Sequence, residues 1–63
     1  MPITEQKAKS LLGVTQLPGT RRQITKMLLA TDELIKEHGE KWIEENRERL
    51  VYEWEFVVNN MSF

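Results

Sequence analysis

The sequence has no cysteine and a single histidine, His38. Disulfide bridges and thiolate metal sites are therefore excluded, and so is a cluster of histidine ligands within one chain. We expect the 63 residues to form a single small helical domain (1–63). A domain of this size buries only about 60% of the surface that its unfolded chain exposes. It usually needs additional stabilisation from disulfides, a bound metal or a partner subunit. Because disulfides are excluded, we expect this stabilisation to come from a homo-oligomer or a helical protein partner.

Long apolar runs are also missing. No run approaches the roughly 20 residues that span a membrane. The first residues lack the basic stretch followed by an apolar stretch that marks a secretory signal. The lack of cysteine also fits a reducing compartment. We therefore expect a cytoplasmic protein with no membrane partner.

Groups that could carry chemistry are scarce. His38 stands at a predicted helix end, where it cannot complete a Ser/His/Asp arrangement. Glu33, Glu37 and His38 do not have the Glu-x-x-His spacing of carboxylate metal sites in helix bundles. No glycine-rich phosphate loop is present. The sequence therefore predicts that the protein is not an enzyme and has no catalytic residue, metal, cofactor or small-molecule substrate.

The net charge of −1 hides an asymmetry between the two halves of the chain. Residues 1–30 contain five basic residues and one acidic residue, which give +4. Residues 31–63 contain four basic and nine acidic residues, which give −5. This split indicates a basic face for an anionic partner, two oppositely charged surfaces that meet in a dimer, or simply a solvated surface.

Cap signals predict the first two helices. Over residues 4–12, Thr4 fits an N-cap, and the following Gly13 suits the left-handed residue beyond a helix end. A loop with the turn signal Pro18-Gly19 follows.

A second helix is predicted over residues 20–38, because Thr20 and Gln23 have the spacing of a capping box. Apolar residues at helical spacing follow, and Gly39 ends the helix. Thr31-Asp32 could instead cap a separate short helix, although the apolar stripe continues across this pair.

The third helix is predicted over residues 40–59, and it forms an antiparallel hairpin with the second helix over Gly39. Residues 50–58 also alternate with period two, as a strand would. No second strand is evident, and only strand exchange between subunits could pair it, so helix is the preferred interpretation and the fold class is all-α. The helical stripe follows a 4-3 repeat of Ile43, Arg47, Leu50, Trp54, Val57 and Met61.

The third helix has more apolar surface than two short helices can cover. Trp42, Tyr52 and Phe56 fall outside the main stripe, so the helix is apolar on more than one side and needs another layer. The sequence therefore predicts a protein-protein interface, most simply with a second copy of the chain. Its candidate residues are Trp42, Leu50, Tyr52, Trp54, Phe56, Val57 and Met61.

The segment Ala-Lys-Ser-Leu-Leu-Gly-Val-Thr, residues 8–15, resembles the first helix and turn of the helix-turn-helix of small excisionase-like DNA-binding regulators. The resemblance covers residues 7–28, with several residues inserted in the turn. It implies an alternative function in which the start of the second helix binds DNA, where Arg reads guanine and Gln reads adenine. The candidate nucleic-acid residues are Thr20, Arg21, Arg22, Gln23 and Lys26.

Overall fold

The computed structural model of the chain describes residues 3–60, and within this range it contains helices and no strand. The prediction of an all-α fold is therefore confirmed, and residues 50–58 are helical. The helices are α1 (Glu5–Leu12), α2 (Arg21–His38), α3 (Glu40–Glu45) and α4 (Arg47–Asn60).

The ends of α1 and the start of α2 follow the cap signals in the sequence. The Thr4 hydroxyl accepts a hydrogen bond from the Lys7 amide at 3.1 Å. Gly13 ends α1 with φ 69° and ψ 34°, a left-handed conformation that glycine adopts without steric cost. At the start of α2, the Thr20 hydroxyl accepts from the Gln23 amide, and the Gln23 side-chain carbonyl accepts from the Thr20 amide at 2.9 Å. Both predicted caps are confirmed.

The helix α2 is continuous across Thr31 and Asp32. The Thr31 hydroxyl donates to the Met27 carbonyl at 2.8 Å, which lets this polar side chain lie buried without interrupting the helix. A separate short helix at this point is therefore not formed.

The prediction of one helix over residues 40–59 is wrong, because the chain leaves helical geometry at Asn46 (φ −110°, ψ 15°). The Asn46 side-chain amide donates to the Trp42 carbonyl at 2.9 Å, and its backbone amide lies 3.1 Å from the same oxygen. Asparagine disfavours helix interiors because its side chain competes for backbone partners in this way. The 4-3 repeat starting at Ile43 is therefore divided between α3 and α4.

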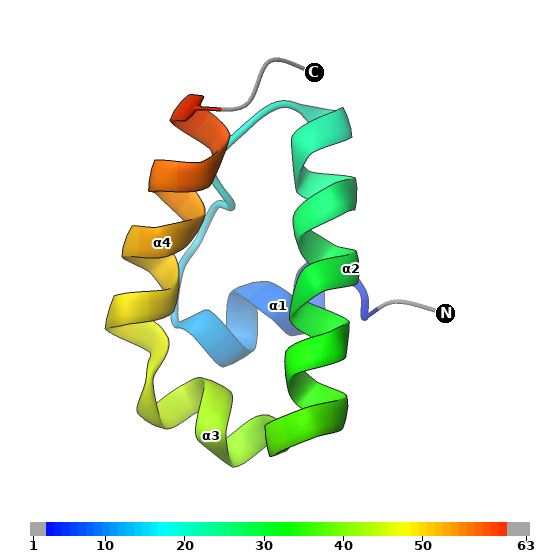
Figure 1. Cartoon of the computed structure of the whole chain (residues 1–63), viewed down its shortest axis with the longest axis vertical. Helices are drawn as coiled ribbons and strands as arrows, with labels where there is room; N and C mark the ends of the chain where they lie inside the picture. Colours follow the sequence, from blue (N-terminus) through cyan, green and yellow to red (C-terminus); the bar gives the residue numbers. More distant parts are fainter. Residues whose placement is uncertain (1–2, 61–63) are drawn as a thin grey trace.

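The chain reverses direction in two steps. In Figure 1, α2 runs down one side of the molecule, α3 crosses the bottom, and α4 runs back up the other side, with α1 lying across the space between them. The predicted antiparallel arrangement of the last two helices therefore holds for α2 and α4, but α3 separates them. The helix α1 contacts all three of the others.

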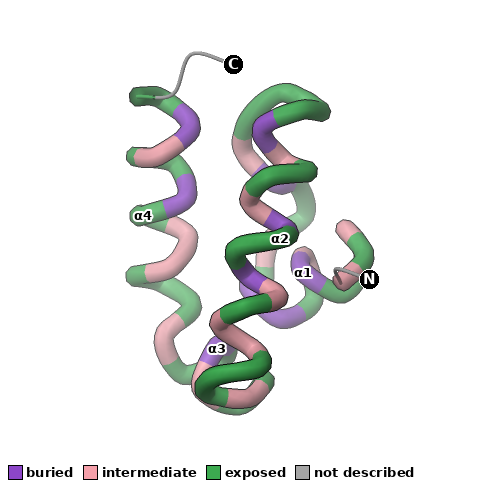
Figure 2. Tube along the Cα trace, turned by 45° about the vertical axis from the view of Figure 1, so that its right-hand side comes forward, coloured by how far each residue is buried: buried purple, intermediate pink, exposed green. Residues whose placement is uncertain are grey.

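One core lies where α1 and the loop that follows it meet the inner faces of α2, α3 and α4. The buried stretches of α4 lie on the side that faces the rest of the molecule (Figure 2). Ile43 and Ala8 have no exposed surface, and Trp54 is 2% exposed. The buried hydrophobic side chains are Ala8, Leu11, Leu12, Leu17, Leu28, Ile43, Trp54 and Val58.

Candidate interaction site

The structure divides the predicted interface residues into three groups, of which the first is Trp54 alone. Its side chain is buried, and its indole Nε1 donates to the Pro18 carbonyl at 2.9 Å. The loop between α1 and α2 therefore contacts Trp54, so this residue belongs to the core and offers a partner almost no exposed surface. Met61, another of the predicted residues, lies outside the described range.

Tyr52 and Phe56 form the second group, and they lie on the outside of α4. Tyr52 is 72% exposed and Phe56 is 61% exposed. Residues four apart are neighbours on one helix face, and this face is opposite the buried Trp54 and Val58. We call Tyr52 and Phe56 the α4 ridge. The exposed carboxylates Glu48, Glu53 and Glu55 lie around it.

The third group lines an apolar groove between α2 and α4 with a volume of about 200 Å³. Leu12 of α1 and Trp54 lie at this groove, together with side chains from both long helices. Besides Trp54, three of the predicted interface residues take part: Trp42, Leu50 and Val57, all of them half-buried. The remaining lining residues are Met27, Ala30, Thr31, Leu34, Arg49 and Glu53.

Charged and aromatic side chains of the groove lining contact one another. The Arg49 guanidinium carbon lies 5.7 Å from the centroid of the Trp42 ring, a distance at which a cation is attracted to the ring face. The Arg49 Nε lies 3.9 Å from a carboxylate oxygen of Glu53. Trp42 also stacks on His38, with ring centroids 4.2 Å apart. Trp42 therefore already has partners within its own chain.

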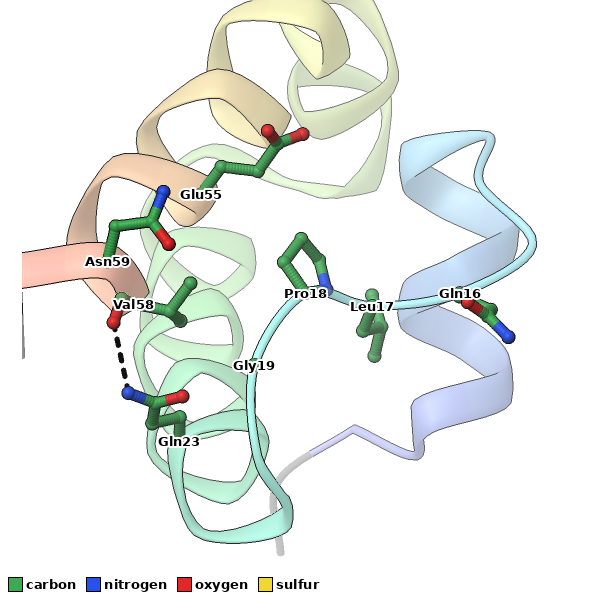
Figure 3. A pocket seen from close by; sticks show the side chains of 8 residues that line it. All are labelled: Gln16, Leu17, Pro18, Gly19, Gln23, Glu55, Val58 and Asn59. Carbon is green, nitrogen blue, oxygen red and sulfur yellow. Dashed lines mark hydrogen bonds between the residues drawn. The ribbon is translucent and has the colours of Figure 1, made fainter.

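The candidate nucleic-acid residues surround the start of α2, but Gln23 is not available to read a base. Its side chain is 7% exposed. The amide nitrogen donates to the Val58 carbonyl at 3.0 Å, as Figure 3 shows, and the amide oxygen accepts from the Thr20 amide. Gln23 therefore joins the start of α2 to the last turn of α4. Its role is structural, and the prediction that it contacts adenine has no support in this geometry.

The basic residues of this region remain at the surface. Arg21 forms an ion pair with Glu5 of α1. Arg22 and Lys26 are exposed one turn apart on α2. Residues 21–31 contain three basic residues and no acidic one. Three of the five basic residues in the positively charged part of the sequence, residues 1–30, therefore lie on the first half of α2.

Leu29 is an exposed hydrophobic residue that the sequence interpretation missed. It is 51% exposed, whereas its neighbour Leu28 is 8% exposed. The pair of adjacent leucines could have indicated this exposure, because adjacent residues of a helix point in directions about 100° apart. Only one of the two leucines can therefore face the core.

A second depression, of about 420 Å³, lies where the Gln16–Gly19 loop meets the last turns of α4 (Figure 3). Gly19 has φ 108°, and a Cβ there would lie 3.1 Å from Val58 Cγ1. Glycine is therefore required for the loop to approach α4 this closely. We interpret this depression as the seam between loop and helix.

Within residues 3–60, no group of three His, Asp or Glu side chains is arranged to hold a metal ion. None of the helices in that range has the length and apolar character that a membrane span requires. Three surfaces gather the exposed or half-buried side chains described above: the α4 ridge, the groove beside it and the basic half of α2.

The resemblance of residues 7–28 to a helix-turn-helix stays a prediction, because it rests on the sequence alone. In comparisons with known proteins, no family model, no curated protein and no solved structure matches this chain.

Proposed function

We propose that this chain is a non-enzymatic protein that acts through protein-protein association, with a second copy as its partner and the α4 ridge as the contact. The observation that carries the proposal is the exposure of two aromatic side chains, Tyr52 (72%) and Phe56 (61%), on one face of α4. Trp54, on the opposite face of the same helix, is buried. The ridge is therefore not needed to complete the core.

The chemistry of the ridge supports this function. Tyrosine and phenylalanine are enriched in interfaces, and charged residues are depleted from the interface centre and gather at the rim. An aromatic side chain brings a large apolar area with only two side-chain torsions to immobilise. The ridge has this composition, since its aromatic pair is bordered by carboxylates. A small domain also gains stability from association, because it buries little surface by itself.

The first prediction concerns the mass of the protein in solution. We expect sedimentation equilibrium in the micromolar range to show concentration-dependent association of the wild-type chain. The double variant Tyr52→Glu/Phe56→Glu should stay monomeric, because it replaces the two aromatic side chains that form the apolar centre of the contact with charged ones. Its helical circular dichroism should match the wild type, since both positions are exposed.

A matched control is the double variant Gln6→Glu/Ser10→Glu. It also adds two negative charges one turn apart on an exposed helix face, that of α1. This variant should associate like the wild type. A wild-type chain that is monomeric throughout the micromolar range would refute self-association through the ridge.

A second candidate function, DNA binding by a small regulator, is favoured by the basic first half of α2. The helix start has a capping box, and three basic residues follow without an acidic one. Arg22 and Lys26 could contact phosphates, whereas Gln23 is engaged with Thr20 and Val58. Binding of this kind would have little sequence preference, because phosphate contacts carry no base information.

The second prediction tests this candidate. If the basic half of α2 binds DNA, random duplex DNA should be retarded in an electrophoretic mobility assay at low salt and released at high salt, because counterion release makes phosphate binding salt-dependent. The Arg21→Glu/Arg22→Glu variant should lose the retardation. Absence of a shift at low salt, or equal binding by the variant, would eliminate DNA binding at this site.

A further inference from the structure

Resting on the proposed self-association, we propose that its second surface is the outward face of α2, so that the α4 ridge of one copy docks on α2 of the next copy. The face on α2 consists of Arg22, Lys26 and Leu29, and we call it the α2 basic face. The α2 basic face and the α4 ridge belong to two different helices. The partner is a second copy of this chain bound in a head-to-tail manner.

The three residues of the α2 basic face form one continuous exposed stripe along the helix. Positions 22, 26 and 29 follow the spacing i, i+4 and i+7, which places them on one side of a helix. All three side chains are exposed, and Leu29 keeps 51% of its surface accessible. The opposite side of α2 holds the buried residues Gln23, Leu28 and Thr31. The face therefore combines one apolar side chain with two positive charges.

The surroundings of the α4 ridge have the complementary charge. Residues 50–60 contain two glutamates and no basic residue, and Glu48 precedes Tyr52 by one turn. The basic residue nearest the ridge, Arg49, is directed to Glu53 and to the Trp42 ring. Leu29 matches the aromatic pair, while Arg22 and Lys26 match the carboxylates and can lie over the ring faces.

Charge also argues against a symmetric contact between two α4 ridges. Such a contact would place Glu48, Glu53 and Glu55 of one copy against the same residues of the other. Like charges that face each other across an interface are costly. The pairing of an acidic aromatic surface with a basic one avoids this repulsion, and it explains why the two charge signs are segregated along the chain.

The position of the two surfaces determines the kind of assembly. The helices α2 and α4 lie on opposite sides of the molecule in Figure 1, and their buried faces point inward. The α2 basic face and the α4 ridge therefore point away from each other, and one copy cannot make the contact with itself. A contact between two different surfaces propagates from copy to copy, and it gives a ring or an open chain of subunits.

Reciprocal charge reversal tests this arrangement. The first variant, Arg22→Glu/Lys26→Glu, keeps an acidic ridge but makes the α2 face acidic. The second, Glu48→Lys/Glu55→Lys, keeps a basic α2 face but surrounds the ridge with positive charge. Each variant alone should associate at least about tenfold more weakly than the wild type. An equimolar mixture should regain growth, with the two variants alternating, because the acidic ridge of the first variant fits the basic α2 face of the second, and the basic surroundings of the second ridge fit the acidic α2 face of the first.

Sedimentation of the wild type, of each variant and of the mixture separates the outcomes, with circular dichroism as the check that each chain is folded. The neutral pair Arg22→Gln/Lys26→Gln, expected to weaken association less, serves if a reversed variant fails to fold. A wild type that associates while Arg22→Glu/Lys26→Glu associates equally well overturns docking on α2 but leaves self-association through the ridge. A mixture that remains monomeric also overturns it. A monomeric wild type instead refutes the proposed function.

Discussion

Replacing Trp54 with alanine is expected to lower the free energy of unfolding by about 3–5 kcal/mol, the usual cost of truncating a buried aromatic side chain. Trp54 is 2% exposed and packs in the core with residues of α1 and of the following loop. The substitution also removes the hydrogen bond from its indole Nε1 to the Pro18 carbonyl. It therefore opens a cavity and releases the loop at the same time.

The expected loss is comparable with the whole stability of the protein. At about 0.05–0.15 kcal/mol per residue, a chain of this length has a free energy of unfolding of roughly 3–9 kcal/mol. A large fraction of Trp54→Ala should therefore be unfolded at room temperature. Urea titration followed by far-ultraviolet circular dichroism measures this without depending on fluorescence, which the substitution of one of the two tryptophans would alter.

Two control variants separate the packing of Trp54 from its hydrogen bond. Trp54→Phe keeps an aromatic ring but not the donor, and should cost about 1–3 kcal/mol. Trp42→Ala removes a tryptophan that is only half-buried, so it should cost less than Trp54→Ala. An unchanged urea midpoint for Trp54→Ala would show that the Trp54 ring does not lie in the core.

The second large effect is expected at Ile43, where alanine should cost about 2–5 kcal/mol. Ile43 has no exposed surface and is the one core residue contributed by α3, a helix of six residues. Helices shorter than about 12–15 residues are marginal by themselves. Packing of Ile43 against the core is therefore the main reason why α3 forms.

Urea titration of Ile43→Ala and Ile43→Val checks this prediction. The valine variant keeps the branched shape and should cost only about 0.5–1.5 kcal/mol. If both variants keep the midpoint of the wild type, the side chain beyond Cβ contributes little, and another contact must hold α3 in place.

The local features of the fold could be predicted from the sequence, because they depend on residues close together in the chain. The caps at Thr4 and Thr20 and the left-handed Gly13 follow from side-chain and backbone chemistry within one turn. The direction of Tyr52 and Phe56 follows from helix periodicity once Trp54 is placed inside.

The features that escaped prediction have two causes. Trp54 is covered by Pro18, which lies 36 positions earlier, and no local pattern encodes that contact. Gln23 likewise contacts Val58, which lies 35 positions later. The sequence alone showed only that a glutamine can read a base, and it did not show this contact within the fold. The break at Asn46 arises locally, because the Asn46 side chain competes for the Trp42 carbonyl. It was not predicted, because the apolar repeat that continues across this position favours an unbroken helix more strongly than one asparagine disfavours it.

The two corners of the chain, at Gly39 and Asn46, affect the distance between α2 and α4. A hairpin with a single corner would bring two long helices into direct contact along their length. Two corners with a short crosspiece hold α2 and α4 apart, and α1 lies across the space between them (Figure 1). The separation of the two helices that line the groove is therefore determined by α3, a connecting helix of six residues.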